Sequence, residues 1–408
     1  MNHLSIPQVL GLLAVMLGAA KVFGAIFQHF GQPAVLGELF AGVVLGTSAS
    51  GLVNPQDATL HLLAELGVVI LLLEIGLETD LSKLLKVGGA ALMVASVGVV
   101  LPFALGFAAC SALGLGSLTA VVAGATLTAT SVGITARVLL DLNRLQEPEC
   151  QIILGAAVID DVMGLVILAV VTSLTQGVEI TAFGIAKTTG LACGFLVGTL
   201  LIGRFAIPAF VRQACRIDLP GTPTILALIS AFVLAWLAAE TGSALLIGAF
   251  ATGLLLRETP QAHEMRQGVT HLGHFFVPLF FVSVGAAVDV RVLNPFDTAN
   301  HQTFLVGGLL LLAAVTGKFL AGYSPFWFKG QKRAIGVGMI PRGEVGLIFA
   351  QMGLATGVFT PGVFGAIMFV IVATTFMTPP LLKKVFPPVE PVRIPSEPEG
   401  IAELVAKP

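Results

Sequence analysis

The sequence predicts an all-α polytopic membrane protein of about thirteen transmembrane helices, and three observations lead to this fold class. Of the 408 residues, 56% are hydrophobic and only 11% are charged. Apolar stretches of about 20 residues, the length that crosses a bilayer as a helix, recur as far as about residue 386. Tyr and Trp are nearly absent while Gly reaches 47 residues, which favours closely packed helices over a β-barrel with aromatic girdles.

The expected helices follow one another with short loops between them. The first 20 residues lack the basic region and cleavage site of a signal peptide and are therefore assigned to the first helix. Residues 1–386 form the transmembrane unit, and residues 387–408 form a short tail. The predicted spans are 5–29, 33–50, 59–78, 88–113, 117–140, 150–174, 181–203, 222–240, 242–257, 268–289, 302–323, 332–356 and 362–385.

The distribution of Lys and Arg tests this order of helices, because loops on the cytoplasmic side carry most of the basic residues. With the N-terminus outside, alternate loops collect nearly all of them, and only Arg291 and Lys187 lie on the wrong side. The pattern predicts a cytoplasmic C-terminus. The inner residues are Lys83, Lys86, Arg144, Arg204, Arg212, Arg216, Arg257, Arg266, Lys329, Lys332, Arg333, Lys383 and Lys384.

Two expected helices, the fifth and the twelfth, are interrupted by small, polar or helix-breaking residues. The interruptions are Ala129-Thr130-Ser131-Val132-Gly133 and Met339-Ile340-Pro341-Arg342-Gly343-Glu344. Their positions suggest a repeat of six helices, about 5–174 and 222–385, on either side of a linker helix at 181–203. Interrupted segments at matching positions of two halves indicate a transporter site at the middle of the membrane. The alternative is a pair of kinked helices that only pack.

The sixth expected helix carries two adjacent carboxylates, Asp160 and Asp161, in an otherwise apolar run. Charged residues at this depth are costly and usually serve a function. Adjacent helical residues point about 100° apart, so the two acids occupy different surroundings. One can face an ion cavity while the other pairs with a cation. Lys318, alone in the apolar eleventh helix, is the expected partner.

This arrangement predicts exchange of a proton for a cation at one carboxylate. Burial disfavours an ionised carboxylate, so protonation can compete with cation binding. A small hard cation prefers oxygen ligands, and Asp161 with the Thr130 and Ser131 hydroxyls can supply them. Na+ at Asp161 is the expected ion, with Li+ or K+ as alternatives.

Structural roles remain open for several of these residues. Asp160 and Lys318 can be an ion pair that only joins two helices. Arg342 and Glu344, next to Pro341, are expected to brace each other or the break more than to bind substrate. Two adjacent acids are harder to assign to structure alone, because their charge exceeds that of one Lys.

Other classes fit the sequence less well. An intramembrane aspartyl protease needs its acids on facing helices, and a DDxxD prenyltransferase needs an acid where Gly164 stands. The four cysteines show no CxxC spacing, so neither a zinc site nor a disulfide framework is expected. No basic patch with aromatic residues indicates nucleic acid. An enzyme and a cofactor are both unexpected.

The segments Gly155 to Val162, Ala129 to Leu139 and Pro341 to Ile348 resemble the monovalent cation:proton antiporter-2 family, especially its NapA-type bacterial Na+/H+ antiporters. The resemblance covers nearly the whole chain. It implies an NhaA-like antiporter fold with inverted repeats and two crossed, broken helices. It also implies a homodimer in the lipid bilayer whose core moves like an elevator. The implied panel domain is 5–78 and 222–289, and the implied core domain is 88–174 and 302–385.

The resemblance also assigns roles to residues. It implies that Asp161 is the main ion-binding carboxylate and that Asp160 pairs with Lys318. Because a double Asp goes with electrogenic exchange in this family, we expect electrogenic transport. Glu74 departs from the family pattern by placing an acid one turn before Glu78. It is a protonated or Ser/Thr-bonded glutamate at a helix interface, an added proton or cation site with Glu78, or a gate between panel and core.

Competing functions within the same scaffold remain. One is K+/H+ exchange or K+ efflux, although residues 387–408 are too few for a gating domain of the nucleotide-binding kind. Another is a sensor without transport, which has no need of the full set of charged residues. The expected location is the bacterial inner membrane, where such exchange would serve pH homeostasis.

Overall fold

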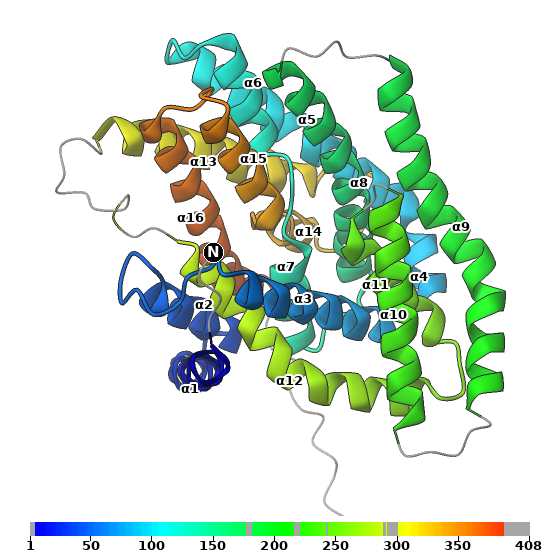
Figure 1. Cartoon of the computed structure of the whole chain (residues 1–408). Helices are drawn as coiled ribbons and strands as arrows, with labels where there is room; N and C mark the ends of the chain where they lie inside the picture. The colour runs from blue at the N-terminus through cyan, green and yellow to red at the C-terminus, as the bar shows by residue number, and fades with distance from the viewer. Residues whose placement is uncertain are drawn as a thin grey trace, which may run out of the picture.

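The structure is a computed structural model that describes residues 5–176, 182–215, 221–241, 244–288, 291 and 301–386. The predicted tail at 387–408 lies outside these residues. Within them the chain is helical throughout (Figure 1). The helices of the first half are α1 (Ile6–His29), α2 (Ala34–Leu45), α3 (Ala58–Glu78), α4 (Leu81–Lys86), α5 (Gly88–Ala112), α6 (Ser117–Thr126), α7 (Val132–Asp141) and α8 (Pro148–Gln176). Those of the second half are α9 (Ala182–Ala214), α10 (Thr222–Glu240), α11 (Leu245–Leu256), α12 (Ala262–Ala286), α13 (His301–Ala321), α14 (Lys332–Gly338), α15 (Glu344–Ala355) and α16 (Pro361–Val385).

The fold class predicted from composition is confirmed. Nine helices in the described part of the chain are long and apolar enough to cross a membrane. The short apolar helices α2, α6, α11 and α15 add further membrane-depth segments. The number thirteen depends on how these short helices are counted, and it stays a prediction.

Local signals in the sequence set several helix ends. Asp57 accepts hydrogen bonds from the backbone N–H groups of Thr59 and Leu60 and so begins α3. Thr360 caps α16 by accepting from the Val363 N–H group. Gly31 and Gly114 follow α1 and α5 with φ of 71° and 73°, the left-handed conformation that ends helices at low cost.

Two helices differ clearly from their expected bounds. The expected helix 181–203 continues to Ala214 in α9, because Arg204 and Arg212 do not end the helix: their long side chains can reach polar surroundings. The expected helix 268–289 begins earlier, at Ala262 in α12, and its first turns are polar. The short helix α4 was not expected; Asp80 caps it.

The long helices pack into two groups. The panel helices are α1–α3 and α10–α12, and the core helices are α5–α8 and α13–α16; α9 lies along the edge beside α10 and α11 (Figure 1). The two groups are named after the predicted panel and core domains, and that division stays a prediction.

Backbone contacts at glycine join the helices within each group. A Cβ atom on Gly76 of α3 would lie 2.4 Å from the Phe250 carbonyl oxygen of α11, and one on Gly253 would lie 2.4 Å from that of Leu73. In the core, a Cβ on Gly317 of α13 would lie 2.8 Å from the Pro102 nitrogen of α5. Helices that approach this closely fit together in one register.

The boundary between the two groups has a different character. At α7, Gly133 faces side chains of the panel, with a Cβ position 3.4 Å from the Phe280 ring and 3.6 Å from a Val68 methyl group. These are ordinary side-chain contacts, so this boundary lacks the tight backbone fit found inside each group.

Candidate functional site

The fifth and twelfth expected helices are broken where the sequence predicted, and the two breaks contact each other. Residues 127–131 separate α6 from α7, and residues 339–343 separate α14 from α15. The Ser131 N–H group donates to the Pro341 carbonyl oxygen at 2.8 Å, and the Thr135 hydroxyl donates to that of Gly338 at 2.7 Å. Each break thus supplies hydrogen-bond partners for the other, as buried backbone groups require.

Asp160 and Lys318 form a buried ion pair. The Lys318 Nζ atom lies 3.0 Å from Asp160 Oδ2, and both side chains are fully buried. Lys318 reaches α8 from α13 across α5, where Gly98 leaves room: a Cβ there would lie 3.4 Å from the ammonium group. The other carboxylate oxygen of Asp160 has no hydrogen-bond partner among the described residues.

Asp161 points away from this pair and into a small cavity. The cavity has a volume of about 10 Å³, room for one water molecule, and its other lining residues are apolar. They come from α3, α7, α8 and α11: Leu72, Val132, Leu154, Val158, Leu246, Ile247 and Phe250. The two adjacent acids therefore have different surroundings, and Asp161 lies where the panel and core helices meet.

The predicted hydroxyl ligands lie at the break but do not line this cavity. The Thr130 hydroxyl donates to the Met339 carbonyl oxygen at 3.2 Å. The Ser131 hydroxyl is buried without a hydrogen-bond partner in the described residues and lies against Gly343, whose Cβ position is 2.5 Å away. Both remain candidate ligands. In this conformation, only Asp161 among the predicted ligands reaches the cavity.

Arg342 is a second buried cation, and it contacts the break between α6 and α7. It is fully buried, and its Nη1 atom donates to the Ala129 carbonyl oxygen at 2.8 Å. Thr374 and Thr375 of α16 bind its backbone. Two of its guanidinium nitrogens have no hydrogen-bond partner in the described part of the chain, and Asp160 is the acid that acts on it electrostatically. The side chain of Glu344, its expected brace, lies outside the described residues.

The four buried charged side chains near the crossed breaks balance when all are ionised. Asp160 and Asp161 contribute two negative charges, and Lys318 and Arg342 contribute two positive ones. The surplus charge expected from two acids against one Lys is therefore offset by Arg342. Protonation of Asp161, or binding of a monovalent cation to it, changes the total by the same single charge.

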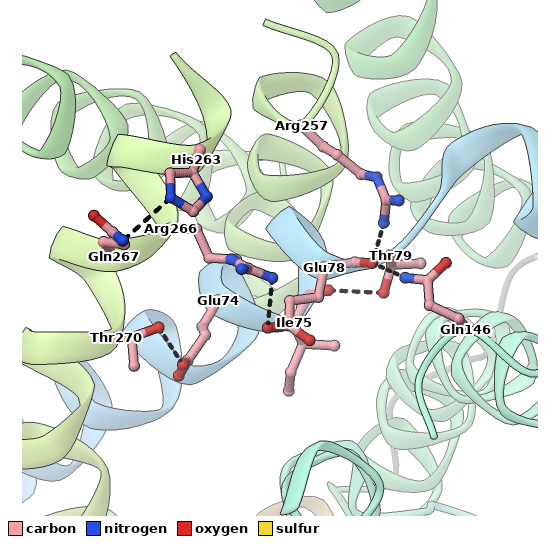
Figure 2. A network of polar contacts seen from close by, with 10 residues as sticks. All are labelled: Glu74, Ile75, Glu78, Thr79, Gln146, Arg257, His263, Arg266, Gln267 and Thr270. Atoms are coloured by element: carbon pink, nitrogen blue, oxygen red, sulfur yellow. Dashed lines mark hydrogen bonds and ion pairs between the residues drawn. The ribbon is translucent and has the colours of Figure 1, made fainter. Parts of the chain in front are cut away.

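A second and larger cavity lies beside the C-terminal end of α3. Its volume is about 410 Å³, and α3, α7 and α12 line it with charged and polar residues. The Glu74 carboxylate accepts from the Thr270 hydroxyl at 2.6 Å, and Glu78 pairs with Arg266 at 3.3 Å (Figure 2). Gln146 and Arg257 donate to the Glu78 carbonyl oxygen (Figure 2). Glu74 is thus hydrogen-bonded to a hydroxyl group at a helix interface.

His271 and His274 line the same cavity and face each other, with ring centroids 6.2 Å apart. They share this cavity with Glu74, Glu78 and Asp141. In the part of the chain that the structure describes, no three His, Cys, Asp or Glu side chains are grouped to hold a metal ion.

Comparison with known proteins decides the family. The model of the sodium/hydrogen exchanger family, transmembrane, matches residues 12–384. The chain belongs to this family. The chain is 40% identical over 425 residues to the high-affinity Na+/H+ antiporter NhaS3 of Synechocystis sp., and the alignment covers 96% of this chain and 92% of that protein. It is 34% identical over 380 residues to the Na+/H+-K+ antiporter GerN of Bacillus cereus, covering 92% and 95%.

A solved structure has a fold similar to that of this chain. The sodium proton antiporter MjNhaP1 from Methanocaldococcus jannaschii aligns with a TM-score of 0.68 over 94% of this chain and 96% of that chain, at 18% identity. Such low identity extends the likeness to the fold alone. The similarity to NhaP-type antiporters agrees with the predicted all-helical antiporter fold.

Proposed function

We propose that the chain is a secondary active transporter that exchanges protons for Na+, with Asp161 as the shared binding site. One observation carries the proposal: Asp161 lines a cavity between panel and core helices, next to the buried Asp160–Lys318 ion pair. A proton and a cation compete for the same carboxylate, so one leaves before the other binds. NhaS3 and GerN carry Na+/H+ exchange in their names, which supports Na+.

Transport needs Asp161 to face each side of the membrane in turn, and we propose that the core helices slide along the panel helices. The tight glycine contacts inside each group and the side-chain contacts between groups support this division. Rigid bodies with a looser boundary are suited to such motion. We also propose that two copies of the chain form a homodimer through their panel helices.

We further propose that exchange is electrogenic. Asp161 alone exchanges one proton for one Na+, which moves no net charge across the membrane. Movement of net charge therefore requires a second group to change its protonation in each cycle. Lys318 is the candidate, because its ammonium group is held by one carboxylate and moves with the core. At 100 mV, one net charge per cycle couples about 2.3 kcal/mol to transport.

The proposed location is the bacterial inner membrane with the C-terminus in the cytoplasm. Arg257 and Arg266, two basic residues predicted on the inner side, both contact Glu78 at the end of α3 (Figure 2). Their shared position supports the predicted alternation of loops.

Purified protein in liposomes tests these proposals. With an imposed pH gradient, we expect proton flux that requires Na+, is accelerated by a membrane potential of the favourable sign, and is lost in Asp161→Asn. Absence of cation-dependent flux, or full flux in that variant, would overturn the shared site. Insensitivity to potential would overturn the electrogenic step only.

K+ exchange is the second candidate, because the name of the relative GerN includes K+. Titration of Na+, Li+ and K+ in the same liposomes separates the two. A lower half-saturating concentration for K+ than for Na+ would establish K+ as the preferred ion.

A further inference from the structure

A second charged cluster lies at the panel–core boundary, away from Asp161. Arg137 is on α7, a core helix, one turn before Asp141. Its Nε atom lies 3.1 Å from Asp141 Oδ1, and its side chain is 16% exposed. Both residues line the 410 Å³ cavity opposite Glu74 of α3. Arg137 is therefore a cation that the core presents to the panel.

Two panel acids flank this cation. Glu38 of α2 is 4% exposed, and its Oε2 atom has no hydrogen-bond partner among the described residues. Glu74 of α3 is 5% exposed and is held by Thr270 of α12, another panel helix. Arg137 interacts electrostatically with Asp141 most strongly, then with Glu38 and then with Glu74. Helix α7 contacts both α2 and α3.

Arg137 is the cation that the core contributes to the lining of this cavity. Elsewhere on the boundary, Lys383 of α16 donates to the Gly31 carbonyl oxygen. Glu78 is already paired with Arg266 inside the panel, and Arg257 binds the backbone at the same place. Lys21 of α1 acts on Glu38 more weakly than Arg137 does. His271 and His274 of α12 lie on the cavity wall. Three carboxylates thus act electrostatically on this guanidinium, and two of the three belong to the panel.

We propose that Arg137 is a positioning residue that holds α7 against the panel through Glu38 and Glu74. The inference rests on the proposed sliding of the core. Because both acids are fixed within the panel, sliding must remove the guanidinium from them. A buried carboxylate that loses its partner is costly, so the contact favours the conformation described here. A cation that enters the cavity and pairs with Glu74 weakens the contact and releases the core.

A labelling experiment measures the position of α7 directly. Leu140 lines the cavity from α7, so a cysteine there reports its exposure to water. The exposed Cys193 and half-buried Cys215 are replaced with Ser, while Cys110 and Cys150 are buried and stay. Leu140→Cys is labelled with a membrane-impermeant maleimide from the side of the Glu78 end, in the full-length protein in liposomes.

We expect Arg137→Gln to reduce the labelling rate at least threefold and Arg137→Lys, which keeps the charge, to restore most of it. In the Glu38→Gln/Glu74→Gln background, Arg137→Gln should change the rate less than 1.5-fold, because its partners are already neutral. The control Arg144→Gln removes a cation whose partner, Glu147, lies in the same loop of the core. It should leave labelling unchanged.

The transport assay supplies an independent readout. If the inference holds, Arg137→Gln changes the turnover rate in the wild-type background and changes it much less in the Glu38→Gln/Glu74→Gln background, whereas Glu147→Gln leaves the rate unchanged. Equal effects of Arg137→Gln in both backgrounds, or unchanged labelling in a folded protein, would overturn the inference. Failure of the proposed function is distinct: wild-type protein would then show no cation-dependent proton flux, whatever the labelling result.

Discussion

At the residue scale, the buried carboxylate of Asp160 depends on the ammonium group of Lys318. We predict that Lys318→Met destabilises the protein by about 3 to 5 kcal/mol, because it leaves the fully buried Asp160 without its ammonium group. Unfolding of the purified protein in detergent, followed with heat or denaturant, measures this loss.

The double variant Asp160→Leu/Lys318→Met is the matched control. Removal of both charges avoids an unpaired carboxylate, so most of the stability should return even though transport changes. If the double variant were as unstable as Lys318→Met, the lost ion pair itself, and not the unpaired carboxylate, would set the stability.

Gly343 gives a second prediction at this scale. A methyl group there would lie 2.5 Å from Ser131 Oγ and 2.7 Å from Ser131 Cβ, so Gly343→Ala forces the crossed breaks apart. We expect a loss of about 1 to 3 kcal/mol, typical of overpacking. Adding Ser131→Gly removes both contacting atoms and should recover stability, which thermal unfolding of the three variants can establish.

The residue scale also shows what a single sequence can reveal. Asp160, Asp161 and Lys318 were found because charges are rare in apolar helices, and that rule needs no knowledge of contacts. A role of Arg342 in bracing the break could be expected from its position after Pro341, but its contact with the Ala129 carbonyl oxygen could not, because the sequence does not show which segments meet. Arg137 was missed because it lies near a helix end, where a basic residue looks solvated.

At the scale of elements, the crossed breaks depend on hydrogen bonds between them. We predict that Thr135→Val costs about 1 to 3 kcal/mol, because the buried Gly338 carbonyl oxygen loses its hydroxyl donor. The control Thr356→Val removes a hydroxyl that bonds within its own helix at an exposed position and should cost much less. Similar unfolding of both variants would contradict the special role of the crossing.

The breaks themselves could be predicted, whereas several helix ends could not. Thr, Ser, Gly and Pro inside an apolar run interrupt a helix through their own backbone chemistry, so the sequence locates them. The end of α9 at Ala214 depends on where its polar turns emerge from the bilayer, which composition does not record. Which break meets which also depends on tertiary packing, since residues 131 and 341 are far apart in the chain.

At the scale of the whole molecule, the proposed competition at Asp161 would set the pH dependence of exchange. As pH falls, a larger fraction of the carboxyl group is protonated, so more Na+ is needed for half-maximal flux. We predict that the apparent KM for Na+ rises about tenfold per pH unit once pH is below the pKa of the group, while the maximal rate stays constant.

Initial rates in liposomes with equal pH on both sides measure this dependence. Glu147→Gln, which removes an acid of the Arg144 pair outside both cavities, should give the wild-type curve. A maximal rate that falls with pH at constant KM would exclude simple competition.

The distance along the chain between the buried partners has a consequence for biosynthesis. Asp160 and Lys318 are separated by 158 residues, which a ribosome adds in roughly 8 to 32 s at about 5 to 20 residues per second. Helix α8 must therefore enter the membrane and wait without its counter-ion. During that interval its acids are most stable as neutral carboxylic acids, and α13 completes the site only when it is inserted. A truncated chain that stops before α13 should thus be a preferred substrate for membrane quality control.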